Sequence, residues 1–475
     1  KDGKPIVTPS QDMVIGNYYL TLQNTKADFL AKAKKAKAEG DVEEAERLEL
    51  YAESEGKVFK TVDDVIRAYQ TKQIHLHNRI AIVGSALMKK DFTEEQNKSY
   101  LKTTVGILFF NLIFPSDFPY INGAIDEKKV SFDVKDLEKD FIKRGENVKE
   151  IIANSKIDKQ PIGKKHLGQI INEIFQRYDR QGISKTSAVL DKLKDQGFKY
   201  STIAGFTVSL ADIQEIQVVN EKQEIVAAGD KKVEKINDMY DKGLLTNAER
   251  HKHVVNVWTQ VSKDVENKLS DKFSKKTRNP IYMMSKSGAR GNMSNILQLA
   301  GMRGLMGSTS GDTVELPVKS CFCEGMSVSE FFIATHGARK GGADTALKTA
   351  DSGYLTRRLV DVSQDVIVRE EDCGTDHGFE VFEIRDSARN AVIVKLEDRL
   401  VGRYALNDVI NPATGEVIVK GNTMIEEESA KAIVDAGIKS VTIRSLFGCE
   451  TKDGVCVHCY GRNLATGRKV EIGEA

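Results

Sequence analysis

The chain has 475 residues, 40% hydrophobic and 29% charged, which suits a globular protein of about three domains. Its net charge is +1, so overall charge does not point to nucleic acid, and any such contact must be local. No apolar run approaches the ~18 residues of a membrane span and no secretory signal opens the sequence, so we expect a soluble intracellular protein. A start at Lys1 without Met predicts a piece of a longer polypeptide.

The first half of the sequence predicts helices around a short strand. Residues 25–56 are rich in Ala, Lys and Glu, which favour helix, and predict a solvated helical excursion. The alternating run at 73–85 predicts a strand in which His75 and His77 face the same way. A histidine pair of this kind is more often structural than metal-binding.

Residues 220–270 predict an antiparallel helical hairpin with a tight tip. Gly243 suits the position just after a helix, and Thr246 with Glu249 forms a capping box that starts the next one. The apolar face of the second helix has helical spacing and consists of Val254, Trp258, Val261 and Val265. Because the remaining surface is highly charged, we expect the hairpin to project; a helix pair within a core is the alternative.

A long helix is predicted over 325–363, after a glycine-punctuated stretch at 287–312 with a short helix near 292–300. Arg339 and Arg357 are about five turns apart at ~3.6 residues per turn, so they share one face. The other cations of this helix are Lys340, Lys348 and Arg358. A long helix with cations spaced along it is suited to binding the phosphate backbone of a nucleic acid. Small residues and glycines fill its middle, and a buried glycine-rich core helix remains the alternative.

The last hundred residues predict short strands and a metal site. Four cysteines are candidate ligands, namely Cys373, Cys449, Cys456 and Cys459. Thiolates two residues apart can bind one tetrahedral ion, and four sulfurs close its coordination sphere, so we expect one structural zinc. Disulfides or free thiols are the alternative, and Cys321 and Cys323 are interpreted as plain buried thiols. The predicted fold is α+β: mostly helical and multidomain, with a long helix, a helical hairpin and a small β-rich segment.

Residues 335–362 resemble, almost without a break, the bridge helix of multisubunit RNA polymerases in its bacterial form. Residues 287–291 and 298–306 resemble the segments that support that helix, and residues 9–12 resemble a motif beside the family's metal-binding loop. The hairpin resembles the rim of the secondary channel, and the four cysteines match the family's zinc site. The resemblance covers essentially the whole chain and implies the largest (β′) catalytic subunit of bacterial DNA-directed RNA polymerase.

The resemblance also implies roles for single residues. Arg290 would approach the incoming ribonucleoside triphosphate, and Gln11 would reach the same substrate. The bridge-helix positions that would face template DNA, hold its phosphates or anchor the helix are Thr349, Ala350, Tyr354, Arg339, Lys340, Lys348, Arg357 and Arg358. Two positions depart from the family pattern. Gly342 stands where Leu is usual, which is expected to loosen the first half of the helix, and Cys323 replaces an arginine, which removes a salt link.

Two catalytic elements of the family are expected outside this sequence: the aspartate-rich loop that binds Mg²⁺, upstream, and the trigger loop, downstream. The isolated chain is therefore predicted to be inactive. The expected division is a pore and secondary-channel domain at 1–205, a funnel and rim region with the hairpin at 206–310, the bridge helix at 311–365, and a β-rich zinc segment at 366–475.

As part of the whole enzyme, the chain would transcribe DNA into RNA in the bacterial cytoplasm, in association with the nucleoid. The implied partners are the β, α, ω and sigma subunits, template DNA with the RNA–DNA hybrid, ribonucleoside triphosphates, and transcript-cleavage factors at the rim hairpin. No membrane partner is expected. A non-catalytic, zinc-stabilised module that binds nucleic acid or protein factors is the alternative function.

Overall fold

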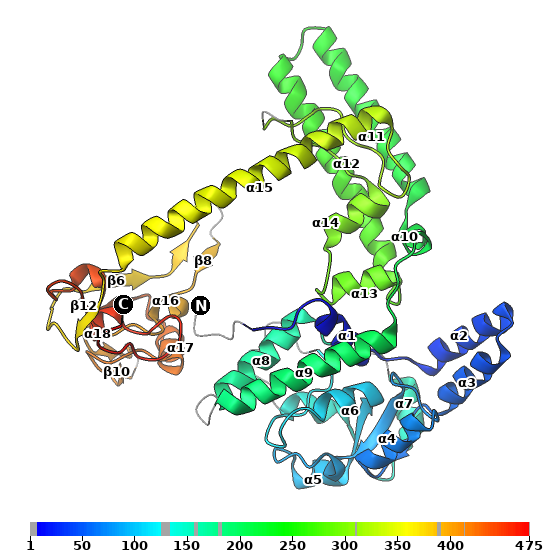
Figure 1. Cartoon of the computed structure of the whole chain (residues 1–475), viewed down its shortest axis with the longest axis horizontal. Helices are drawn as coiled ribbons and strands as arrows, with labels where there is room; N and C mark the ends of the chain where they lie inside the picture. The colour runs from blue at the N-terminus through cyan, green and yellow to red at the C-terminus, as the bar shows by residue number, and fades with distance from the viewer. Residues whose placement is uncertain are drawn as a thin grey trace. The chain divides into compact units, whose positions relative to one another are not determined.

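The computed structural model describes residues 7–124, 134–155, 160–178, 183–308, 311–386, 391–412 and 414–474 (Figure 1). These residues form two compact units, 7–340 and 341–474. Helices and small sheets occur together, which confirms the α+β class. The finer division into four segments stays a prediction.

The first unit contains a four-stranded sheet in the order β1-β2-β3-β4. Its strands are β1 (Val58–Phe59), β2 (Arg79–Val83), β3 (Tyr100–Thr104) and β4 (Phe141–Ile142). β1 is parallel to β2, and the other neighbours are antiparallel. All residues of β2 are buried, and Ile80, Ile82 and Leu101 lie in the largest hydrophobic core.

Helices surround this sheet, and most of them contribute to the same core. They are α1 (Asp12–Leu20), α4 (Val62–Gln70), α5 (Glu94–Lys98), α6 (Val105–Asn111), α7 (Val148–Asn154), α8 (Lys164–Tyr178) and α9 (Ile183–Ala204), with 3₁₀ turns η1 (Gly84–Leu87) and η2 (Val134–Asp140). α7 packs in a separate small cluster with Ala81 and Ile142, and α5 buries no residue. α1 and α9 touch backbone to backbone, because a Cβ on Gly16 would lie 1.8 Å from the carbonyl oxygen of Gly197. Asn17 fastens the crossing through hydrogen bonds from its side-chain amide to the carbonyls of Met13 and Leu193. Only glycine permits so close an approach.

The excursion predicted at 25–56 is a helical hairpin of α2 (Lys26–Glu39) and α3 (Val42–Glu53). A small core that includes Phe29 and Tyr51 joins the two helices. The strand prediction for 73–85 was only half right, since β2 starts at Arg79 and both histidines precede it. His75 packs against the rings of Phe29 and Tyr51, and His77 Nε2 lies 2.8 Å from the Tyr19 carbonyl. Burial lowers the pKa of both histidines, as suits structural side chains.

The hairpin predicted at 220–270 consists of α11 (Val219–Asp241) and α12 (Asn247–Lys275), which run side by side in Figure 1. The capping box of Thr246 and Glu249 is present, and Gly243 has a φ of 73°. The apolar face predicted for the second helix is buried. Two ion pairs fasten the hairpin to the segment before the long helix: Arg250–Glu315 at 2.8 Å and Lys319–Asp230 at 2.7 Å.

Shorter helices link these parts, namely α10 (Leu210–Ile216), α13 (Pro280–Lys286), α14 (Met293–Ile296) and the π-helical turn η4 (Leu297–Gly301). The π-helical turn leaves the carbonyls of Gln298 and Leu299 to accept hydrogen bonds from the backbone amides of Phe322 and Cys323. Irregular turns of this kind occur often at functional sites. Here the turn holds the segment that leads into α15 (Val328–Ser363), the helix predicted over 325–363.

The second unit is built from paired short strands and small helices. Its strands are β5 (Val368–Glu370), β6 (Phe379–Phe382), β7 (Ile384–Arg385), β8 (Val392–Val394), β9 (Val409–Ile410), β10 (Val417–Val419), β11 (Ser440–Ile443) and β12 (Val455–Cys456). Its helices are α16 (Leu396–Leu400), α17 (Glu427–Asp435) and α18 (Val457–Tyr460), with the 3₁₀ turn η5 (Leu446–Gly448). β5 pairs in parallel with β12, far along the chain. In the described part of the chain, no helix is both long and apolar enough for a membrane span.

Candidate functional site

The four candidate cysteines lie together in the second unit. Their sulfur atoms, one each from Cys373, Cys449, Cys456 and Cys459, are all within 4.8 Å of one another. The sulfur of Cys373 is 3.7 Å from that of Cys459 and 3.8 Å from that of Cys449. A tetrahedral ion with ~2.3 Å bonds keeps its sulfur ligands about 3.8 Å apart, so the cluster fits one such ion.

Local structure brings these cysteines together. The pairing of β5 with β12 carries Cys373, shortly after β5, to Cys456 at the end of β12. Cys456 caps α18, and its sulfur accepts a 3.3 Å hydrogen bond from the backbone amide of Cys459. The sulfur of Cys449 accepts a 3.4 Å bond from the amide of Cys456. Amide donors favour the thiolate form that binds metal.

Arg444 is a member of this centre that sequence reasoning missed. Its Nη2 lies 3.3 Å from the sulfur of Cys373, 3.5 Å from that of Cys459 and 3.8 Å from that of Cys456. Arg444 is buried although it follows β11, where the buried residues Val441 and Ile443 alternate with less buried ones. The alternation along β11 predicts an exposed side chain at position 444, and a charged residue is ordinary at such a position. The sequence therefore gave no indication that Arg444 is buried.

Asp372 and its neighbours hold the guanidinium of Arg444. Burial raises the pKa of Asp372, but hydrogen bonds from Arg444 and the Gly374 amide outweigh burial and hold that pKa well below its usual range. His458 contacts Asp372 and stacks on the ring of Tyr404 at 4.4 Å. The His458 ring thus contacts Asp372 and Tyr404, and the four sulfurs complete the set of metal ligands without it.

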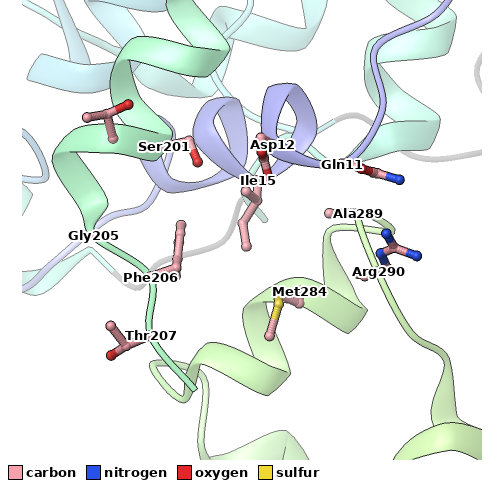
Figure 2. Close-up of a pocket in the computed structure, with 11 residues that line it drawn as sticks. Gln11, Asp12, Ile15, Ser201, Gly205, Phe206, Thr207, Met284, Ala289 and Arg290 are labelled. Carbon is pink, nitrogen blue, oxygen red and sulfur yellow. The ribbon is translucent and has the colours of Figure 1, made fainter. Parts of the chain in front are cut away.

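A pocket of about 520 Å³ in the first unit brings Gln11 and Arg290 together. Figure 2 shows these two side chains on the same side of the pocket, and the apolar residues Ile15, Phe206 and Met284 lie around the rest of it. The remaining lining residues are Asp12, Ser201, Thr202, Gly205, Thr207 and Ala289. The pocket therefore has an apolar floor with an amide and a guanidinium at one edge.

Two glycines shape the loop that carries Arg290. Gly288 has a φ of 75° and Gly291 a φ of 80°, values that favour glycine. The backbone amide of Arg290 donates to the Met284 carbonyl at 3.1 Å, and the Ser287 carbonyl accepts from the Lys164 amide at 2.8 Å. The side chain of Arg290 is exposed and makes no ion pair with any described residue. The loop is thus fixed and its cation is free for a ligand.

Gln11 occupies an unusual backbone conformation immediately before α1, with a φ of 47° and a ψ of −115°. Non-glycine residues seldom adopt positive φ, and such strain often marks functional sites. The amides of Val14 and Ile15 donate to the Gln11 carbonyl at 3.0 Å, which fixes this conformation.

α15 exposes most of the side chains predicted to face a nucleic acid. Thr349, Ala350 and Tyr354 are exposed, as are four of the five cations, Arg339, Lys348, Arg357 and Arg358, while Lys340 is half-buried. The hydroxyl of Thr349 donates to the carbonyl of Thr345 at 2.7 Å. That bond satisfies the hydrogen-bonding capacity of the hydroxyl within the helix and leaves the methyl group available for contact with a planar ligand.

The start of α15 is fixed by Glu330. Its carboxylate accepts hydrogen bonds from the backbone and side chain of Ser327, from those of Ser320, and from the Lys319 amide, at 2.9–3.2 Å. Burial raises the pKa of Glu330, but the bonds from Ser327 and Ser320 outweigh burial and lower that pKa to about 2. Nearby Cys321 and Cys323 are both free thiols, and Cys321 is buried as predicted, but the prediction that Cys323 is buried was wrong, since it is only half-buried. Glu324, next to Cys323 in the chain, forms an ion pair with Lys222.

Comparison with known proteins decides the family. The models of RNA polymerase Rpb1 domain 3, domain 4 and domain 5 match residues 1–213, 245–324 and 325–475, respectively. The DNA-directed RNA polymerase subunits β′ of Halalkalibacterium halodurans and Geobacillus kaustophilus are each 51% identical over the whole chain. The subunit β′ of Bacillus cereus strain ATCC 14579 is 50% identical, again over the whole chain.

The chain belongs to the β′ family of RNA polymerase subunits. It spans 36% of the length of the relatives named above. The family assigned from the resemblance is confirmed, and the alternative of a non-catalytic module is not favoured.

Proposed function

We propose that the chain forms the part of a bacterial β′ subunit that guides ribonucleoside triphosphates to the catalytic centre and supports the template, so that the whole enzyme transcribes DNA into RNA. One observation carries the nucleotide part of this proposal. Gln11 and Arg290 lie far apart in the sequence, were assigned to the same substrate by resemblance, and line one pocket.

Arg290 suits a triphosphate because its planar guanidinium can donate two parallel hydrogen bonds to phosphate oxygens. Its loop is held by backbone hydrogen bonds, so little order has to be gained when the nucleotide binds. Gln11 can offer an amide donor and an acceptor to the sugar or the base. The proposed task of both residues is to orient the substrate.

α15 suits the template strand. Its cations would bind phosphates without reading sequence, while the small surface at Thr349 and Ala350 would lie against the base that awaits pairing, supported by Tyr354. The proposed partner of this helix is therefore the DNA template within the RNA–DNA hybrid region. Transcript-cleavage factors are the proposed partners of the tip between α11 and α12.

The four cysteines are proposed to bind one zinc ion with a structural role. Four thiolates leave no open position for a substrate, so the ion would join β5 to β12 and not take part in catalysis. The described residues offer no second group of ligands like the cysteines. The Mg²⁺ of the enzyme is proposed to bind elsewhere in the subunit. The other proposed partners are the β, α, ω and sigma subunits, in the bacterial cytoplasm and at the nucleoid.

Substitution of Arg290 tests the nucleotide site. In the assembled polymerase, Arg290→Gln is expected to raise the KM for nucleotides tenfold to a hundredfold, because hydrogen bonds to charged groups contribute about 1.5–3 kcal/mol. Lys286→Gln is the matched control, since Lys286 is an exposed cation on α13 that does not line the pocket. Steady-state RNA synthesis at varied nucleotide concentration measures the effect. Equal KM values for the two variants would contradict the proposal.

A further inference from the structure

The proposed zinc site poses a charge problem for the second unit. Zn²⁺ with four thiolates carries a net charge of −2, and two of the sulfurs belong to the buried residues Cys456 and Cys459. A buried net charge is costly unless opposite charges or hydrogen bonds lie nearby. The backbone amides of Cys456 and Cys459 each donate to one sulfur. Amide dipoles alone leave the cluster without a full positive charge.

Arg444 supplies that charge at contact distance. Its Nη2 touches the sulfurs of three cysteines at 3.3–3.8 Å, and only 3% of the residue is exposed. We propose that Arg444 is the positioning residue of the metal centre, which stabilises the thiolates and so retains the ion. The inference rests on the proposed zinc site and adds a residue that binds no metal itself.

The surroundings of Arg444 favour this role because they fix the orientation of its guanidinium. Nη2 is 2.6 Å from Asp372 Oδ1, and Nη1 donates to Asn422 Oδ1 at 2.7 Å. Asn422 in turn donates to Asp372 Oδ2 at 2.8 Å, which closes a triangle of polar contacts. The positive end of the Arg444–Asp372 pair therefore faces the sulfurs, and Asp372 lies next to Cys373 in the chain. A lysine would bring charge but could not make both fixed contacts.

An ordinary structural ion pair between Arg444 and Asp372 is the competing interpretation. Such a pair would affect folding of the unit but would leave the chemistry of a bound ion unchanged. The two interpretations differ in the lability of the metal and in the electronic state of the sulfurs. Both quantities can be measured in variants that remain folded.

The first experiment measures zinc release from polymerase assembled with the full-length subunit, by chelator competition. Zinc that disappears in Cys456→Ser defines the ion of this site. Arg444→Gln is expected to weaken its retention tenfold to a hundredfold, as is typical for partners that hydrogen-bond to ligands. Arg444→Lys should lie between Arg444→Gln and the parent. Arg462→Gln is the matched control, because Arg462 pairs with Glu427 at 3.6 Å and makes no hydrogen bond to the cysteine sulfurs.

Cobalt substitution gives the second readout. Hydrogen bonds lower the energy of sulfur lone pairs, so Arg444→Gln should move the sulfur-to-Co²⁺ charge-transfer band to longer wavelength, relative to the parent and to Arg462→Gln. Unchanged release together with an unchanged band would overturn the role of Arg444. If Arg444→Gln does not assemble, Asp372→Asn decides: faster zinc release than Arg462→Gln supports the inference, and equal release overturns it. If the parent holds no more zinc than Cys456→Ser, the metal site itself is wrong.

Discussion

Glu330 connects the first turn of α15 to the preceding segment through five hydrogen bonds to one carboxylate. Glu330→Gln removes one acceptor oxygen and the negative charge near the N-terminus of the helix, where anions are favourable. We expect a loss of about 1–2 kcal/mol of local stability, moderated by the partial exposure of the carboxylate. Faster amide hydrogen exchange at Ser320 and Ser327 would measure it. Asp344→Asn, the same change of charge later in α15, should leave these amides unaffected.

The lowered pKa of Glu330 also determines how the stabilisation by its carboxylate changes with pH. In the folded protein the pKa of Glu330 is lowered to about 2 from its ordinary value of 4.5. The stabilisation that its carboxylate contributes is therefore complete above pH ~4.5 and disappears as pH falls toward 2. The exchange difference between parent and Glu330→Gln should therefore shrink in acid and stay constant above pH ~5. A difference that grows in acid would show that the carboxylate is not the group responsible.

For single residues, the sequence predicted the site where metal ligands require a fixed spacing along the chain. The separation of Cys456 from Cys459 indicated a metal turn, and the structure places Cys373 and Cys449 beside them. Arg444 could not be found, because its burial depends on a strand pairing and on Asp372, which follows a different strand. Spacing along the chain does not contain that information.

Among the elements, α15 contains an unusual pair of glycines, Gly341 and Gly342. A Cβ on either would meet no atom within 4 Å, so no close contact requires glycine here. Each glycine in a helix interior costs about 1 kcal/mol relative to alanine. Gly342→Ala is therefore expected to slow amide exchange in the neighbouring turns roughly fivefold, with a similar direction for Gly342→Leu. Ala343→Gly, the reverse change at the next position, should accelerate exchange by a similar factor.

Hydrogen exchange of the parent and the two variants tests whether Gly342 loosens the first half of the helix. Equal exchange in Gly342→Ala and the parent would contradict the expectation, and would mean that neighbouring parts of the enzyme already hold this turn. α15 would then tolerate glycine without any change in its local stability.

Prediction of the elements succeeded where local signals agreed with one another. The capping box at Thr246, the turn at Gly243 and the apolar face through Trp258 all indicated the hairpin that is observed. Prediction failed at His75 and His77, where alternation suggested a strand but aromatic packing against Phe29 and a contact with Tyr19 hold a turn. Tertiary contacts overrode the local pattern there.

At the scale of the whole molecule, α15 exposes several large apolar side chains. Its exposed apolar side chains include Leu347, Tyr354, Leu355, Leu359 and Val362, each more than half exposed. Large exposed apolar patches mark interaction surfaces. The chain also spans only 36% of the length of its relatives. Both observations favour burial of this surface by further polypeptide in the assembled enzyme. The sequence of α15 itself does not indicate which polypeptide covers it.

The mass of the native polypeptide tests that expectation directly. We expect immunoprecipitation and intact mass spectrometry to give a chain about three times the 52.7 kDa of this sequence, because relatives of such length align with all of it. Such a chain would be long enough to contain the expected Mg²⁺ loop and trigger loop in the same polypeptide. A native chain of 52.7 kDa would contradict the expectation. The aspartate-rich loop would then have to be sought on a companion polypeptide in the same precipitate, and its absence there would favour the non-catalytic alternative.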